Sequence, residues 1–354
     1  MTHDERLAML RARFPNDRRD DVQVPEFRRA QSLEFSADGR RKLPFAGVPT
    51  FFGAPYRPDA PEAADFGGLQ AALIGVPMDL GVTNRSGARF GPRAVRMVER
   101  IGPYNHALRV SPFGELCTGD VGDVPFRSRY NLEQSIEDIE NFFTRVHAAG
   151  VMPVAIGGDH SMTYPILRAL GRDRPVGLVH IDAHCDTSGP HEGSRFHHGG
   201  PFRQAVLDGV LDPMRTIQIG IRGPAEMFYE FSRVSGMTVL HAEAVDAMGV
   251  EAVLALTRTV IGDQAFYVSF DVDGLDPAFT PGTGTPEVGG LTPREAQRIL
   301  RGLAGMPIIG GDVVEVAPQY DATTTTAQIG AQMAFEILSL IALAPTSGPQ
   351  MRNA

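Results

Sequence analysis

From about Asp65 onward, short apolar runs alternate with stretches of helical periodicity. The apolar runs do not alternate polar with apolar residues, and this is typical of strands buried on both faces of a parallel sheet. They span residues 71–76, 151–156, 176–181, 216–221, 237–241, 265–270 and 307–316. The pattern therefore predicts strands of a mostly parallel sheet.

The segments between these runs have the apolar spacing of amphipathic helices. The predicted helices span residues 92–101, 132–149, 163–170, 201–207, 224–234, 250–260, 293–303 and 327–343. Strand and helix in repeated alternation indicate one α/β domain with helices on both faces of the sheet. In such folds the functional groups gather at the carboxyl ends of the strands.

The first 66 residues differ from the rest, because they are rich in Pro, Arg and Asp and show little periodicity. We expect residues 1–66 to form an N-terminal extension, 67–345 the catalytic domain and 346–354 a C-terminal tail. The apolar, proline-broken segment 43–52 favours an arm that is ordered on the body or on a neighbouring subunit.

Composition narrows the class of protein. Hydrophobic residues make up 43% and charged residues 21% of the 354 positions, which is ordinary for a soluble globular protein. A net charge of −9 argues against a nucleic-acid partner, and no apolar run approaches the roughly 20 residues of a membrane helix. The N-terminus has no apolar core of a signal peptide, and only Cys117 and Cys185 occur. We therefore expect a cytoplasmic protein without disulfides.

Acidic residues and histidines cluster where three of the predicted strands end, at residues 157–161, 182–187 and 271–276. Side chains at i, i+2 and i+4 of an extended segment point the same way, so Asp182, His184 and Asp186 can converge on one point. The same alternation aims Asp271 and Asp273 together and turns Cys185 away.

No Lys or Arg stands beside these groups, so a divalent cation is their natural counter-charge. Two cations suit four carboxylates and two imidazoles, and mixed oxygen and nitrogen ligands favour Mn, Ni, Co or Fe over Ca or Mg. Taken singly, each Asp could instead cap a turn, and Asp276 before Pro277 is expected to do so.

These segments resemble the motifs of the ureohydrolases, the arginase and agmatinase family. The similar stretches are GGDHS at 157–161, DAHCDT at 182–187 and SFDVDGLDPAFTPGTGTPE at 269–287, with NRSGARFGPRAVR at 84–96, HHGGPFRQAV at 197–206 and GGDVVEVAPQYD at 310–321. The resemblance covers residues 67–345 and is nearer to the agmatinase-like branch. It implies a three-layer α/β/α sandwich around a mostly parallel eight-stranded sheet.

The resemblance also implies roles for individual residues. One ion would be held by His160, Asp182, Asp186 and Asp271, and the other by Asp182, His184, Asp271 and Asp273. Water shared by the two ions would attack a guanidinium carbon and release urea. Glu315 would bind the guanidinium, and Asp186 would be a further catalytic residue. His198 would carry protons between the site and solvent. Its neighbour His197 is the alternative for that role.

The sequence leaves the substrate open among agmatine, guanidino acids and guanidine itself. Arginine is not expected, because Ser188 stands where arginases have an asparagine; segment 187–197, which should contact the substrate's tail, contains both Glu192 and Arg195. Alternatives are a formimino-type hydrolase of the same family and a metal-bound subunit that supports a paralogous partner. We expect two transition-metal ions per chain, manganese before nickel, and a homo-trimer or homo-hexamer.

Overall fold

The computed structural model describes residues 1–15, 22, 24–35, 40, 42–99 and 101–345, so the predicted tail at 346–354 lies outside the described residues. Eight strands form one sheet in the order β2-β1-β3-β8-β7-β4-β5-β6, and every neighbouring pair is parallel. The strands are β1 Ala71–Val76, β2 Thr118–Asp123, β3 Met152–Gly157, β4 Val176–Ile181, β5 Leu211–Ile221, β6 Thr238–His241, β7 Phe266–Asp271 and β8 Ile308–Val314.

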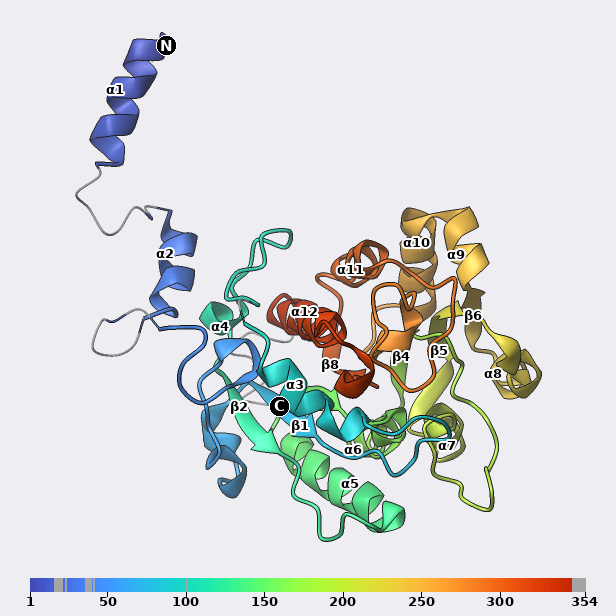
Figure 1. The fold of residues 1–354 in the computed structure, drawn as a ribbon. Coiled ribbons are helices and arrows are strands. Elements are labelled where there is room, and N and C mark those ends of the chain that lie inside the picture. Colours follow the sequence, from blue (N-terminus) through green and yellow to red (C-terminus); the bar gives the residue numbers. More distant parts are fainter. Residues whose placement is uncertain (16–21, 23, 36–39, 41, 100, 346–354) are drawn as a thin grey trace.

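Helices cover both faces of this sheet (Figure 1). They are α1 His3–Arg13, α2 Pro25–Ser32, α3 Gly91–Arg96, α4 Pro112–Glu115, α5 Leu132–Ala148, α6 Thr163–Leu170, α7 Pro201–Leu207, α8 Glu230–Ser235, α9 Ala242–Met248, α10 Val250–Ile261, α11 Pro293–Arg301 and α12 Thr325–Ala342. Successive residues of β1 enter different cores: Leu73 packs in the core beneath α10, α11 and α12, and Ile74 in the core beneath α5, α6 and α7. Both faces of the strand are buried, which is why its sequence is continuously apolar.

The predicted three-layer α/β/α sandwich is confirmed, and the sheet is wholly parallel among the described strands. All seven predicted strands are present, with ends shifted by a few residues. The eighth, β2, was missed because its sequence TGDVGD resembles a turn. The helix predicted over 224–234 is a short 3-10 helix followed by α8, and the helix predicted over 92–101 ends at Arg96.

The N-terminal segment contains two helices that the sequence analysis did not predict. Helix α1 has no buried residue, whereas α2 lies against α4. The ring of Phe27 in α2 also meets the ring of Tyr104, in the loop before α4, edge to face with the centroids 5.1 Å apart. Farther along, Phe52 packs on Phe335 of α12. The part of the arm near residue 52 is therefore ordered on the body (Figure 1).

The strand order decides where the acidic segments meet. Strands β3, β8, β7 and β4 are consecutive neighbours in the middle of the sheet. Because parallel strands end at the same edge, the residues that follow these four strands converge at one place.

Candidate active site

The candidate site lies at the carboxyl ends of these four central strands. His160 follows β3, Glu315 follows β8, and Asp273 follows β7, which itself ends at Asp271. Asp182 to Asp186 follow β4, so all the predicted ligands meet at one edge of the sheet. Asp186 and Glu315 have positive φ angles of 52° and 63°, a strained conformation that residues other than glycine rarely adopt.

One cluster forms around the Nδ1 atom of His160. This atom lies 3.1 Å from Asp182, 2.9 Å from Asp186 and 3.3 Å from Asp271, and it has no aligned hydrogen bond. A single proton on this nitrogen would neutralise only a part of the three surrounding carboxylates. The donor set fits a divalent cation held by all four groups.

A second cluster forms around His184. Its Nδ1 atom lies 3.4 Å from Oδ1 of Asp182 and 3.3 Å from Oδ2 of Asp273. Asp182 therefore turns one oxygen toward each histidine, as expected of a carboxylate that bridges two ions. Asp273 also accepts hydrogen bonds from the Ala183 amide and the Thr285 hydroxyl, which fix its direction.

The electrostatics of the acids support the same conclusion. Burial, together with the charges of Asp273 and Asp182, raises the pKa of Asp271 well above its usual range. Burial and the Asp182 charge raise the pKa of Asp273 to about 6. Without a cation, burial and mutual repulsion make the ionised forms of Asp271 and Asp273 unfavourable. A divalent cation would keep both carboxylates ionised.

His180, which the sequence analysis did not single out, lies beside the first cluster. Its Nε2 atom is 2.8 Å from Oδ2 of Asp182, and its Nδ1 atom faces the amide nitrogen of Gln218 at 3.1 Å. That amide also donates to the Cys185 carbonyl, so it is oriented as a donor. Nδ1 of His180 is therefore the acceptor and Nε2 carries the proton. His180 thus holds Asp182 in place by donating to it, although it is close enough to be grouped with His160 and Asp182 as a ligand.

His160 is oriented by a buried relay that the sequence analysis also missed. Its Nε2 atom lies 2.8 Å from the Ser269 hydroxyl, which donates to Asp312 at 2.7 Å. Because the Ser269 proton is used on Asp312, Ser269 accepts the Nε2 proton of His160. In the neutral tautomer Nδ1 of His160 is then a lone pair aimed at the acidic cluster.

Glu315 and His198 form a pair next to the clusters. Oε1 of Glu315 accepts the His160 amide and lies 3.0 Å from Nδ1 of His198, whereas Oε2 is buried and finds no hydrogen-bond partner in the described part of the chain. Nε2 of His198 accepts the Thr83 amide and contacts the Thr83 hydroxyl at 2.7 Å. Burial lowers the pKa of His198, but the Glu315 charge and hydrogen bond outweigh it and raise the pKa to about 9, so the ring readily takes up a second proton on Nε2, which would replace the hydrogen bond from the Thr83 amide.

His197 and Cys185 point away from this pair and from the clusters. Nε2 of His197 lies 2.8 Å from the Gly189 carbonyl, and Cys185 packs with Ile221 and Tyr229, as the alternation of side chains predicts for Cys185. Of the segment 187–197, Glu192 and Arg195 are exposed and Phe196 is buried. Asp276 accepts the Ala278 amide of its own turn, as expected for a turn residue, and also accepts the amides of Gly289 and Gly290 from a later segment.

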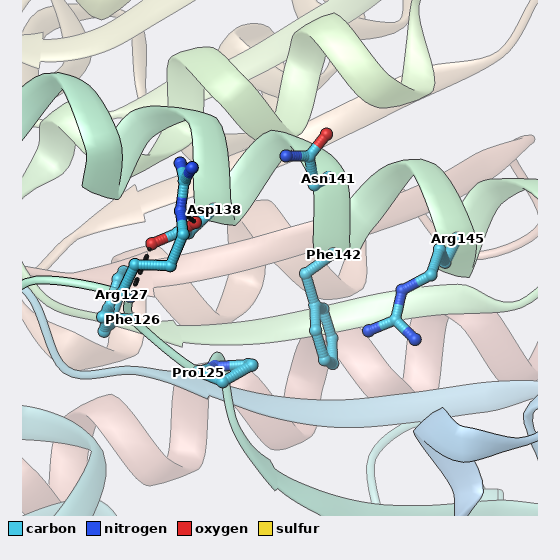
Figure 2. Close-up of a pocket in the computed structure, with 7 residues that line it drawn as sticks. All are labelled: Pro125, Phe126, Arg127, Asp138, Asn141, Phe142 and Arg145. Carbon is cyan, nitrogen blue, oxygen red and sulfur yellow. Dashed lines mark hydrogen bonds and ion pairs between the residues drawn. The ribbon is translucent and has the colours of Figure 1, made fainter.

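A separate surface groove of about 320 Å³ lies between α5 and the segment after β2, lined in part by Pro125, Phe142 and Arg145 (Figure 2). It contains none of the predicted site residues.

Comparisons with known proteins agree with this geometry. A profile of the arginase family matches residues 69–339. Over 87% of its length the chain is 49% identical to a guanidinopropionase of Pseudomonas aeruginosa, 98% of which is covered. Over 77% of its length it is 47% identical to a mitochondrial agmatinase of Gallus gallus, 82% of which is covered.

Among solved structures, a proclavaminate amidino hydrolase from Streptomyces clavuligerus superimposes with a TM-score of 0.80 at 35% identity, covering 85% of this chain and 99% of that one. None of the helices in the described part of the chain combines the length and hydrophobicity that a membrane crossing requires. The chain belongs to the arginase family, in the agmatinase-like branch of its metal-dependent ureohydrolases.

Proposed function

We propose that this protein hydrolyses a small guanidino compound to urea and an amine, and that its substrate is a short guanidino acid. The observation that supports this most directly is Oε2 of Glu315, a buried carboxylate oxygen without a partner beside the metal-binding clusters. An ionised oxygen buried without a donor is costly, and a planar, permanently charged guanidinium supplies the donors it lacks.

Gly284 leaves room beside this oxygen. A Cβ atom added there would lie 3.7 Å from Oε2 of Glu315 and only 2.8 Å from the Arg85 carbonyl. Any other residue would therefore press on the Arg85 backbone next to the proposed guanidinium position. Arg85 is itself bonded to the carbonyls of Thr283 and Gly284, which fixes this wall of the site.

We assign the two ions to the residues that converge in the two clusters. One is held by His160, Asp182, Asp186 and Asp271, and the other by Asp182, His184, Asp271 and Asp273, with manganese as the first choice and nickel as the second. When bound, such a pair of cations would make hydroxide available from water near neutral pH. The protein's part would be to hold the guanidinium on Glu315 beside the two clusters.

We assign proton transfer to His198. Its Nδ1 proton is shared with Oε1 of Glu315, so the ring lies beside the proposed guanidinium site. The departing amine needs a proton, and the carboxylates of the clusters are committed to the ions. An imidazole beside the substrate can deliver that proton and recover it from solvent through the Thr83 side.

The choice of a guanidino acid rests on the relative named guanidinopropionase, which matches along almost its whole length. The exposed residues Glu192 and Arg195 of segment 187–197 stay the expected contacts of the substrate's tail. Agmatine, with a cationic tail, is the second candidate because of the agmatinase relative.

The test is urea release by the purified chain from 3-guanidinopropionate, 4-guanidinobutyrate, agmatine, arginine and guanidine, with manganese and nickel loading in parallel. We expect the highest kcat/KM for a guanidino acid and no useful rate with arginine. Formamide release from formiminoglutamate, without urea from any guanidino compound, would instead support the formimino alternative. Urea formed only when a paralogous chain is added would support the partner-subunit alternative.

We also propose that the protein works in the cytoplasm as a homo-trimer or homo-hexamer to which residues 1–66 contribute. Leu43, Phe45 and Val48 are exposed in the single chain, and Phe45 is 75% exposed. Apolar side chains gathered on an ordered arm are typical of a surface that a neighbouring subunit covers.

A further inference from the structure

Arg222 is a buried cation whose guanidinium bonds, among the residues that the structure describes, to backbone carbonyls alone. It follows β5 directly and is 6% exposed. Its guanidinium donates to six carbonyls, those of Gly220, Asp273, Gly274, Leu275, Glu287 and Val288, at 2.7–3.2 Å. Within the described residues no carboxylate lies at ion-pair distance from it. Burying a guanidinium without a counter-charge costs free energy, which the hydrogen bonds to these carbonyls offset. The same bonds hold the segments that carry the carbonyls in fixed positions.

Three of the six carbonyls that Arg222 binds belong to the turn that carries one ligand of the second cluster. Asp273 lies in that turn, and Arg222 bonds to its carbonyl and to those of the two residues that follow. The Arg222 amide donates to the Ala183 carbonyl at 2.8 Å, one residue before His184. Arg222 thus joins the end of β4 to the turn after β7, the two segments that provide His184 and Asp273.

Arg222 also anchors Glu287, whose carboxylate faces the outer nitrogen of His184. Oε1 of Glu287 lies 3.8 Å from Nε2 of His184, while Nδ1 of the same ring faces Asp182 and Asp273. Gly223 provides the space, because a Cβ atom there would lie 2.6 Å from the Glu287 carboxyl carbon. At 3.8 Å this is an ion-pair contact and not a hydrogen bond, but its order of carboxylate, imidazole and acidic cluster is the one in which a carboxylate orients a metal-binding histidine.

His160 and His184 differ in how deeply the side chains that orient them are buried. His160 is oriented by the fully buried Ser269 and Asp312, whereas Glu287 retains 26% of its side-chain exposure. We propose that Arg222 and Glu287 form a positioning unit for His184 and Asp273, so that the affinity of the second ion is set separately from that of the first. This inference rests on the proposed two-ion site.

The test measures metal binding directly on the full chain. Mn²⁺ is titrated into chelator-treated protein and free Mn²⁺ is followed by electron paramagnetic resonance, with elemental analysis of the product. We expect wild type to bind two ions. Glu287→Gln should keep the Mn²⁺ affinity of the first site, around His160, and should weaken that of the second site, around His184, by about 10- to 100-fold. Glu243→Gln, the same change at an exposed position of α9, is the matched control and should bind as wild type does.

Ser269→Ala provides the reciprocal variant, because it removes the acceptor of His160 and should weaken the other ion. Excess Mn²⁺ should restore most of the turnover of Glu287→Gln with unchanged KM. Equal weakening of both ions by Glu287→Gln, unchanged binding of both, or a higher KM with intact binding would each overturn the positioning role. If wild type binds fewer than two ions, the proposed two-ion site fails as well, and that result is seen without any variant.

Discussion

Both ring nitrogens of His198 have partners, and this sets it apart from its neighbour His197. Thr83 donates its amide to Nε2, which favours a proton on Nδ1, where Glu315 accepts it. The resemblance assigns the proton carrier to His198, with its neighbour His197 in the same loop as the alternative. His197 lies against the Gly189 carbonyl, and we keep the assignment to His198 as a prediction.

His198→Asn should therefore keep both ions and lower kcat by about 10²–10⁴, the usual size of a general acid–base contribution. Steady-state kinetics and metal analysis of the purified variant measure this, and added imidazole should restore part of the rate. His197→Asn is the control and should stay within a few-fold of wild type. The reverse ranking of the two variants would assign the proton carrier to His197.

Glu315→Gln tests the proposed guanidinium contact. The amide is nearly isosteric but carries no charge, and a hydrogen bond to a charged group is worth about 1.5–3 kcal/mol. We expect kcat/KM to fall by at least about tenfold, with both ions retained. An unchanged kcat/KM for every guanidino compound would show that the guanidinium binds elsewhere.

At the scale of elements, α12 begins at a turn that Asp321 stabilises. Its carboxylate accepts the amides of Thr323 and Thr326 and the Thr323 hydroxyl. Burial alone would raise the pKa of Asp321, but these hydrogen bonds outweigh it and lower the pKa to about 2. Because the folded-state pKa lies below the unfolded value, Asp321 stabilises the fold above about pH 4, and this contribution is lost as the pH falls toward 2.

Asp321→Ala should therefore lower the free energy of unfolding by about 1 kcal/mol at pH 7, as for other capping residues. Urea denaturation of chelator-treated protein between pH 2 and 7 checks this without interference from metal release. The difference between wild type and variant should shrink as the pH falls below 4. A difference that stays constant down to pH 2 would mean that the carboxylate charge has no part in it.

Strands buried on both faces were predictable because their sequences are continuously apolar, as in β1 and β3. Strand β2 was not predictable, since its glycines and aspartates resemble a turn. Its extended conformation is stabilised by pairing with β1, a contact that the local sequence does not reveal. Likewise, the acidic segments were visible as motifs, but Arg222 was not. Its role arises from carbonyls of segments far away in the sequence, and no local pattern signals such contacts.

For the whole molecule, the exposed apolar side chains of segment 43–52 predict association. Light scattering at micromolar concentration should give the mass of a trimer or hexamer, and Phe45→Asp should shift the distribution toward smaller species. The expected cause is burial of the 75%-exposed Phe45 side chain by a neighbouring subunit. A wild-type monomer would contradict this prediction.

Urea release during metal removal and return tests the central claim most directly. The chelator-treated chain should form no urea from its best guanidino substrate, and stepwise addition of Mn²⁺ should restore the rate, reaching its plateau at two ions per chain. The clusters around His160 and His184 predict this stoichiometry. Full activity in the metal-free chain, or a plateau at one ion, would contradict the account.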